Sequence, residues 1–472
     1  MSTGSTRRLR ATYQHPLTPR WANGAGSAWT AETLDDLLRL DDGLGPRVAA
    51  IAGGLAAAGV EPGAVVSWQL PNSDDAIAMF RACWRLGAVA APIHHLAGPA
   101  DVAALRGRLG SAVHVDSADD VPGGEPVPAG AVPVDPASLA LALATSGSTG
   151  VPKLALHTHR ALVYKARLMI RVHQLGPSDC VLMPAPMAHV SGLQNGVLLA
   201  ASGMRVVPMA RWDPAEALAL IERERVTFMI GPPAFFVSLM DAPGFSPAAV
   251  ASLRQISCGG AGVTPAFVRE ASTVLGCRVK RTYGSTEAPT VTTSTLDDPA
   301  ELAATTDGRP TGLVELRITD AGELCVRGPE LFTGYDDPAA TAAAFTDDGW
   351  FRTGDLGTLD ERGWLTIVGR IKDVIIRGGE NIAPAEVEAV LQAHPAVRQT
   401  AVVGYPDRRL GERACAFVVV DGPFDLAACR AWCEQQGLTR FKWPERVEIL
   451  DALPLLPAGK PDRAALSARL AG

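Results

Sequence analysis

The sequence predicts an α/β protein, with a large N-terminal domain of helix-covered, mostly parallel sheets, a small β-barrel-like subdomain and a small α+β C-terminal domain. Short apolar segments alternate with amphipathic ones up to about residue 311, and short segments separated by Gly and Asp turns then run from 312 to 368. A compact stretch of about a hundred residues follows Gly369. We expect an N-terminal domain over residues 1–369 and a C-terminal domain over residues 370–472.

The alternating elements of the N-terminal part predict βαβ units, because parallel strands need helical crossovers. The strand candidates are residues 65–70, 88–93, 181–184, 205–209, 228–230 and 255–258. The helix candidates include residues 47–58, 74–86 and 214–223, with apolar residues at helical spacing. Residues 121–136 are rich in Pro, Gly and Val and predict a surface connection.

The later part of the chain has a different pattern. The sequences Asp320-Ala-Gly322, Asp347-Asp-Gly349 and Glu361-Arg-Gly363 predict turns between short antiparallel strands. In the C-terminal stretch, Pro384 suits the first turn of a helix that has Val387 and Leu391 on one face. We expect strands over residues 399–403, 414–420 and 447–450 and a second helix over 426–436.

Composition excludes several classes of protein. A net charge of −7 and a pI near 5.8 argue against a dedicated nucleic-acid binder. No window holds the ~18 uninterrupted apolar residues of a membrane span. No apolar block follows the arginines of residues 1–20, so we expect this segment to be a flexible tail rather than a secretory signal. The eight cysteines lack Cys-x-x-Cys spacing, which favours a cytoplasmic location. Cys429 and Cys433 share a helix face, where we expect buried small hydrophobes rather than metal ligands.

A loop typical of phosphate binding runs from Thr145 to Lys153 and reads Thr-Ser-Gly-Ser-Thr-Gly-Val-Pro-Lys. Two glycines let the backbone turn beside a ligand, hydroxyls and N–H groups can bond phosphate oxygens, and Lys153 adds a positive charge. The loop is not the P-loop of common NTPases, because only two residues separate Gly147 from Gly150 and Leu154 follows the lysine. Taken alone, the loop is equally well explained as a Ser/Gly-rich surface turn.

Further short motifs follow this loop in a fixed order. They are Tyr283-Gly-Ser-Thr-Glu287, Phe351-Arg-Thr-Gly-Asp-Leu-Gly357, Gly369-Arg-Ile-Lys-Asp373 with Arg377-Gly-Gly-Glu-Asn-Ile-Ala-Pro-Ala-Glu-Val-Glu388, and Pro457-Ala-Gly-Lys-Pro-Asp-Arg463. The ordered set resembles the core motifs of the adenylate-forming superfamily, which comprises acyl-CoA synthetases, adenylation domains of peptide synthetases and firefly luciferase. The resemblance runs from about residue 30 to the C-terminus and is greatest to the acyl-CoA synthetases. The chain is shorter than typical members before Trp29 and around residues 119–137.

The resemblance implies a site for ATP and Mg²⁺. Glu287 matches the family's metal ligand, a hard oxygen donor that suits a cation bridging phosphates. Thr286 matches a contact of the α-phosphate, and Asp355 matches the acceptor of the ribose hydroxyls. Lys460 matches the lysine that bridges the carboxylate and the α-phosphate in the transition state. The implied nucleotide contacts are Thr145, Ser146, Gly147, Ser148, Thr149, Gly150, Lys153, Gly260, Ala261, Tyr283, Gly284, Asp355 and Arg370.

The resemblance also implies that the C-terminal domain is mobile and turns about a hinge at Lys372. One pose would bring Lys460 to the ATP. The other pose would withdraw Lys460 and present Gly378 and Gly379 to the thiol of CoA or of a carrier-protein phosphopantetheine. Glycines suit that place, because a Cβ atom would obstruct a pantetheine arm that passes close to the backbone.

The acyl pocket implied by the resemblance includes Val190, Phe235 and Gly259, with His189 as a further catalytic residue. Relatives that activate amino acids have an Asp in the segment corresponding to 186–190, and dihydroxybenzoate and salicylate relatives have an Asn. This chain has Val190 there, and no carboxylate lies between residues 184 and 210. An ammonium group would stay unpaired, so an uncharged hydrophobic acid is favoured.

We therefore predict an AMP-forming acid–thiol ligase, which activates a carboxylic acid with ATP and transfers the acyl group to CoA. A stand-alone adenylation enzyme that loads a carrier protein stays open, because Trp443 and Glu445 stand where some relatives carry basic residues for the CoA phosphates. A luciferase-like oxygenase stays open as well. A non-catalytic scaffold is disfavoured, since Lys460 and Glu287 are both present. We expect no nucleic-acid or membrane partner, and a homodimer stays open.

Overall fold

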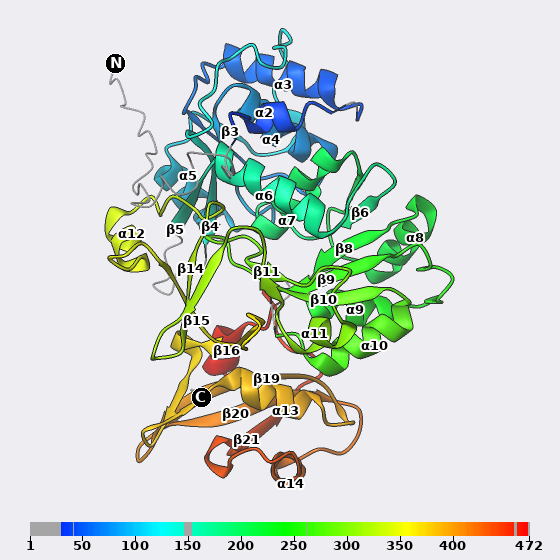
Figure 1. Ribbon diagram of the computed structural model, residues 1–472, viewed down its shortest axis with the longest axis vertical. Coiled ribbons are helices and arrows are strands. Elements are labelled where there is room, and N and C mark those ends of the chain that lie inside the picture. Colours follow the sequence, from blue (N-terminus) through cyan, green and yellow to red (C-terminus); the bar gives the residue numbers. More distant parts are fainter. Residues whose placement is uncertain (1–29, 41, 146–152, 261, 457–459, 471–472) are drawn as a thin grey trace.

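The computed structural model describes residues 30–40, 42–145, 153–260, 262–456 and 460–470 (Figure 1). In Figure 1 the N-terminal elements lie at the top and the orange and red C-terminal unit lies at the bottom. No helix of the described residues is long and apolar enough to cross a membrane.

The first sheet has five strands in the order β3-β1-β2-β4-β5. They are β1 (Val65–Trp68), β2 (Val89–Pro92), β3 (Val113–Val115), β4 (Leu139–Thr145) and β5 (Lys153–Thr158). All neighbours are parallel except β4 and β5, which form an antiparallel pair. The accompanying helices are α2 (Leu34–Leu37), α3 (Gly45–Ala57), α4 (Asp74–Arg85) and α5 (Pro99–Leu109), with a 3₁₀ turn η1 (Ala118–Asp120).

The second sheet has seven strands in the order β12-β11-β10-β9-β8-β6-β7. They are β6 (Cys180–Met183), β7 (Arg205–Pro208), β8 (Phe228–Gly231), β9 (Gln255–Gly259), β10 (Arg278–Tyr283), β11 (Thr292–Thr293) and β12 (Arg309–Pro310). Strands β6 to β10 are parallel, and β11 and β12 add an antiparallel edge. The helices are α6 (His159–Val172), α7 (Val190–Gly196), α8 (Pro214–Glu224), α9 (Pro233–Met240), α10 (Pro265–Leu275) and α11 (Ala300–Thr305), with a 3₁₀ turn η2 (Leu198–Ser202).

The two sheets share an apolar core. One cluster of buried side chains contains Trp68 and Leu141 from the first sheet and Met183 and Phe228 from the second, together with residues of α4, α6 and α7. Figure 1 shows α6 and α7 between the strands of the two sheets. Residues of α8, α9 and α10 form a second cluster with the second sheet, so helices cover both of its faces.

A four-stranded antiparallel sheet, β13-β14-β15-β16, follows. Its strands are β13 (Glu315–Ile318), β14 (Glu323–Arg327), β15 (Phe351–Leu359) and β16 (Leu365–Arg370), and α12 (Pro338–Ala344) lies between β14 and β15 in the sequence. The predicted turn at Asp320-Ala-Gly322 joins β13 to β14, and the turn at Glu361-Arg-Gly363 joins β15 to β16. The antiparallel region expected from residues 312–368 is confirmed.

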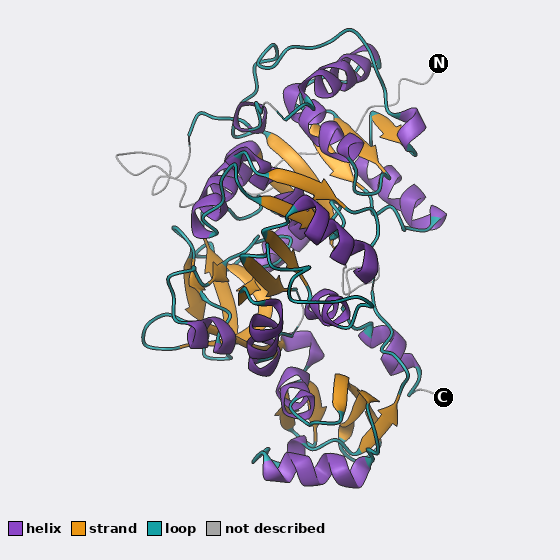
Figure 2. Cartoon of the chain, turned by 90° about the vertical axis from the view of Figure 1, so that its right-hand side faces the viewer, coloured by secondary structure: helices purple, strands orange, loops and turns teal. Residues whose placement is uncertain are grey.

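The C-terminal unit forms a separate group of strands and helices at the lower end of the molecule (Figure 2) and has its own apolar core. Its strands are β17 (Ile375–Arg377), β18 (Glu380–Ile382), β19 (Val397–Asp407), β20 (Gly411–Val420) and β21 (Arg446–Ile449), in the order β18-β17-β20-β19 with β21 parallel to β20. Its helices are α13 (Pro384–Gln392), α14 (Leu426–Gln435) and α15 (Arg463–Ala468), with 3₁₀ turns η3 (Ile371–Asp373) and η4 (Arg440–Lys442). Arg398 on β19 pairs with Asp241, which follows α9, at 2.6 Å and with Asp421 of its own unit at 3.5 Å.

The named strand and helix candidates of the N-terminal part are confirmed, each with ends within about two residues of those expected. Cys429 and Cys433 are buried in the core of the C-terminal unit, as small hydrophobes would be. The connection 121–136 is irregular, as predicted, but it also packs tightly on α3. The N–H of Gly124 donates to the carbonyl of Ala50, and a Cβ atom on Gly53 would lie 1.9 Å from the carbonyl oxygen of Glu125.

Candidate active site

The predicted site residues of the N-terminal domain gather where parallel strands of the second sheet end. His189 and Val190 follow β6, and Phe235 follows β8. Gly259 and Tyr283 are the last residues of β9 and β10, and Gly260 and residues 284–287 come directly after them. Strands β6, β8, β9 and β10 are successive neighbours in this sheet. Because the carboxyl ends of parallel strands share one edge, these segments meet there, as ligand sites in open α/β sheets do.

The ends of the predicted phosphate loop are fixed as an antiparallel pair. Thr145 ends β4 opposite Lys153, which begins β5, and the Thr145 hydroxyl donates to the Lys153 carbonyl at 3.4 Å. The ammonium of Lys153 lies 5.0 Å from the centre of the Tyr335 ring. Five predicted phosphate contacts lie outside the described residues: Ser146, Gly147, Ser148, Thr149 and Gly150.

Glu287 and Thr286 lie in the loop that joins β10 to β11, and other elements hold both residues. The hydroxyl of Tyr335 donates to Oε1 of Glu287 at 2.8 Å. The N–H of Phe332 donates to the Glu287 carbonyl at 2.9 Å, and Nε2 of His157 donates to the Thr286 carbonyl at 2.9 Å. The backbone and the carboxylate of the candidate metal ligand are thus held separately.

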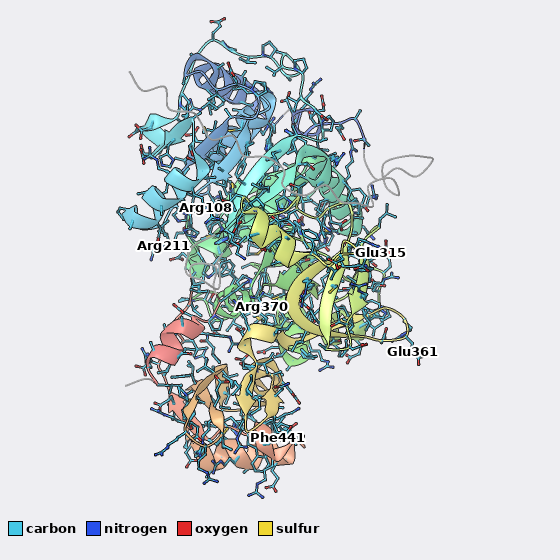
Figure 3. The ribbon with its side chains drawn as sticks, turned by 90° about the vertical axis from the view of Figure 1, so that its left-hand side faces the viewer. Arg108, Arg211, Glu315, Glu361, Arg370 and Phe441 are labelled. Carbon is cyan, nitrogen blue, oxygen red and sulfur yellow. The ribbon has the colours of Figure 1, made fainter. Side chains whose placement is uncertain are left out.

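Asp355 on β15 is held from two sides. The hydroxyl of Tyr283 donates to Oδ2 at 2.7 Å, and Nε of Arg370 lies 2.8 Å from Oδ1. The cross-strand pairing of β15 with β16 puts Asp355 opposite Arg370. Burial and the Asp355 charge raise the pKa of Tyr283 well above its ordinary value, so its hydroxyl stays a donor. Figure 3 shows Arg370 where the large domain meets the C-terminal unit.

Lys460 comes from the C-terminal unit and reaches this same region. A Cβ atom built on Gly260 would lie 3.5 Å from Cε of Lys460. Burial and the charge of Arg370 lower the pKa of Lys460, and Asp355 acts in the opposite direction. Burial and the charge of Lys460 lower the pKa of His189. The structure therefore brings Lys460 together with Gly260, His189 and the Asp355–Arg370 pair; Ala261 lies outside the described residues.

The predicted acyl-pocket residues lie on three elements. Val190 begins α7 and packs against the core shared by the two sheets. Phe235 on α9 is 8% exposed and stacks on Trp212, with ring centres 4.5 Å apart. Gly259 ends β9, and a Cβ atom there would lie 2.4 Å from the Thr282 carbonyl oxygen, so no side chain fits. These three residues are themselves apolar or small.

The hinge and thiol candidates lie next to each other in the sequence. Lys372 is exposed in η3, directly after β16. Gly378 and Gly379 form the two-residue turn between β17 and β18, a hairpin that sequence reasoning missed. Their φ angles of +60° and +91° explain both glycines by backbone conformation. The earlier reason, close passage of a thiol arm, is therefore not needed to account for them.

Two supporting residues were not foreseen. Tyr335 orients the Glu287 carboxylate. The one feature of the sequence that could have drawn attention to this residue is the small number of tyrosines, five in the whole chain. His157 was not among the site residues expected from the sequence. It is fully buried, and burial lowers its pKa to about 4, so its neutral ring can donate to the Thr286 carbonyl.

Comparison with known proteins finds two family models that match this chain. The family model for AMP-binding enzymes matches residues 43–336, and that for the AMP-binding enzyme C-terminal domain matches residues 386–460. The medium-chain fatty-acid–CoA ligase of Escherichia coli (strain K12) is 36% identical over 337 residues, which cover 68% of this chain and 59% of the ligase. The 2,3-dihydroxybenzoate-AMP ligase of Bacillus subtilis (strain 168) is 37% identical over 339 residues, covering 68% and 62%. The chain thus spans less than two thirds of the length of either relative.

Among solved structures, ATP-bound MatB from Rhodopseudomonas palustris superposes with a TM-score of 0.83. The two chains are 27% identical, and the match covers 92% of this chain and 98% of that one. The expected α/β fold, with a large N-terminal domain and a smaller C-terminal one, is confirmed.

Proposed function

Because this chain belongs to the AMP-binding enzyme family, we propose that it activates a carboxylic acid with ATP, releasing pyrophosphate and forming an acyl-adenylate, and then transfers the acyl group to the thiol of CoA. The observation that carries the proposal is the position of Lys460. The side chain of Lys460 extends from the C-terminal unit and lies beside Gly260, near the Asp355–Arg370 pair. A lysine ammonium there can offset the negative charge that develops when a carboxylate approaches a phosphate.

The nucleotide would bind where Tyr283 at the end of β10 meets Asp355 of β15. In the proposal, the residues between Thr145 and Lys153 hold the β- and γ-phosphates, and Thr286 contacts the α-phosphate. Asp355 accepts the ribose hydroxyls. Each oxygen of Asp355 uses one lone pair on Tyr283 or Arg370, which leaves capacity for a diol.

Glu287 fits a Mg²⁺ site. The residue is partly exposed, and Tyr335 donates a hydrogen bond to one of its carboxylate oxygens. A single oriented carboxylate suits Mg²⁺, which usually keeps several waters and binds substrate phosphates rather than a full protein cage. When bound, the cation would neutralise charge on the phosphates.

The acid would enter between α7, α9 and the end of β9, where Val190, Phe235 and Gly259 lie. We propose a neutral, hydrophobic acyl group, since Val190 provides no charge to pair with an ammonium. Lys372 would be the hinge that lets residues 370–472 turn, withdraw Lys460 and present Gly378 and Gly379 to the thiol.

One observation favours an acceptor of the acyl group other than CoA. The carboxylate of Glu445 lies 2.6 Å from Arg377 and also accepts the N–H of Ala414 at 3.3 Å. This pairing offsets a positive charge in the region where some relatives hold the CoA phosphates. Loading of a carrier-protein phosphopantetheine, which has no nucleotide phosphates, is therefore the alternative to CoA.

One experiment tests the function and separates the acceptors. Pyrophosphate release is measured with Mg²⁺ and ATP across a panel of aliphatic, alicyclic, aryl and amino acids, with CoA, with phosphopantetheinylated carrier protein, or with neither. We expect release with neutral hydrophobic acids and acyl transfer to CoA. No acid-dependent release would refute the function, and transfer to the carrier alone would establish the alternative.

A further inference from the structure

A strained residue closes the loop that carries Thr286 and Glu287. Thr290, at the end of this loop, has a φ of +39°, in the left-handed region that β-branched residues rarely adopt. Gly284, at the start of the loop, lies against it, because a Cβ atom on Gly284 would be 2.3 Å from the Thr290 nitrogen. The loop can keep this compact path only while Thr290 keeps its unfavourable conformation.

Three side chains from other elements hold Thr290. The ammonium of Lys165 on α6 donates to the Thr290 carbonyl at 2.6 Å. The Thr311 hydroxyl donates to the same carbonyl at 3.3 Å, and Nε2 of Gln194 on α7 donates to the Thr290 hydroxyl at 3.2 Å. The Lys165 bond is the shortest of the three, and its donor is charged, which makes it the strongest.

Lys165 carries its charge in the interior of the protein. Its side chain is 1% exposed, and Nζ lies 3.4 Å from Oε1 of Glu330, which is fully buried. Burying an ammonium is costly unless it is paired and hydrogen-bonded, so space filling alone does not account for a lysine here. Glu330 also begins the segment whose Phe332 and Tyr335 bind the backbone and the carboxylate of Glu287.

We infer that Lys165 is a positioning residue for adenylate formation: its ammonium, countered by Glu330, holds Thr290 in the left-handed conformation and thereby places Thr286 and Glu287 for MgATP. The inference rests on the proposed function. Lys165 acts through Thr290 and the loop, so its removal should weaken MgATP binding and the adenylation step. The transfer of a preformed adenylate should be spared.

The test replaces Lys165 by methionine, which keeps the length of the side chain and removes the charge. Lys280→Met is the matched control, because Lys280 is also fully buried and donates to a backbone carbonyl, that of Ser294 at 2.8 Å, outside the loop. Calorimetry gives the Kd for MgATP without any acid. Single-turnover assays give adenylate formation and, separately, thioester formation from a supplied acyl-adenylate, and melting curves give the folded fraction.

We expect Lys165→Met to raise the Kd for MgATP at least about tenfold and to leave thioester formation within about twofold, as one charged hydrogen bond predicts. Lys280→Met should leave the Kd near that of the wild type. If Lys165→Met folds poorly, Lys165→Met/Glu330→Gln removes the stranded carboxylate and should show the same Kd change. An unchanged Kd, or equal loss in both steps, would overturn the inference. A wild-type protein that binds MgATP but adenylates no acid would instead refute the proposed function.

Discussion

Removing one hydroxyl, in Tyr335→Phe, tests how Glu287 is held. The hydroxyl donates to Oε1 of Glu287 at 2.8 Å, and hydrogen bonds to charged groups contribute about 1.5–3 kcal/mol. Glu287 is only partly buried, so the lower part of that range applies, about 1.5–2 kcal/mol, or about ten- to thirtyfold in an equilibrium constant. The ring remains, so the contact with Lys153 at 5.0 Å should persist.

The assay is adenylate formation titrated with Mg²⁺ at saturating ATP. Tyr335→Phe should raise the Mg²⁺ concentration needed for half-maximal rate by about ten- to thirtyfold, with little change in the KM of the acid. Tyr164→Phe is the control, because its hydroxyl accepts the Leu313 N–H at 2.9 Å and, among the described residues, makes no hydrogen bond to Glu287. An unchanged Mg²⁺ titration in a folded Tyr335→Phe protein would show that this carboxylate does not serve the metal.

Four further predictions follow from the same site. Lys460→Ala should slow adenylate formation about 100-fold or more and spare thioester formation from a supplied acyl-adenylate; equal losses in both half-reactions would contradict a lysine that acts in one pose. Burial lowers the pKa of His157 to about 4, below its unfolded value, so its stability contribution is present above pH 6.5 and is lost as the pH falls toward 4. His157→Gln should therefore lose about 2 kcal/mol less unfolding free energy than the wild type between pH 7 and 4.5 in urea titrations, and identical losses would refute the assignment. Gly378→Asn suits the φ of +60°, so it should keep the turn while lowering thioester but not adenylate formation; undiminished thioester formation would remove this glycine from the mechanism. In substrate competition, neutral hydrophobic acids should have a higher kcat/KM than every amino acid. An amino acid as the best substrate would contradict the interpretation that Val190 lines a pocket without a partner for an ammonium group.

Much of the fold was predictable because local patterns determine it. Apolar runs between turn residues marked strands such as β8 and β9, and Pro384 marked the start of α13. The strand order was not predictable, since it depends on contacts far apart in the chain. The antiparallel pairing of β4 with β5 is an example, because the phosphate loop that reverses the chain was recognised only as a ligand-binding motif.

The site was predictable where a motif is contiguous in the sequence and less so where a contact joins distant segments. Glu287, Asp355 and Lys460 stood out by their motifs. The residues that orient them did not, because His157 is 129 residues from Thr286, and Tyr335 is 48 residues from Glu287. For Gly378 and Gly379, the motif was recognised but the hairpin was not, so the backbone reason for two glycines became visible only with their φ angles.

The ion pairs of Arg398 with both units affect how the protein distributes between different arrangements of the two units. Its guanidinium pairs with Asp241 across the units and with Asp421 within its own, and all three side chains are about half exposed or more. Exposed ion pairs contribute about 0–1 kcal/mol, which corresponds to a population ratio of about five to one at most. If the C-terminal unit moved away, Arg398 could keep Asp421, so even that small gain would be partly retained. This ion pair therefore adds little to the free-energy difference between arrangements of the two units, and raising the ionic strength should change small-angle scattering of the ligand-free protein only slightly.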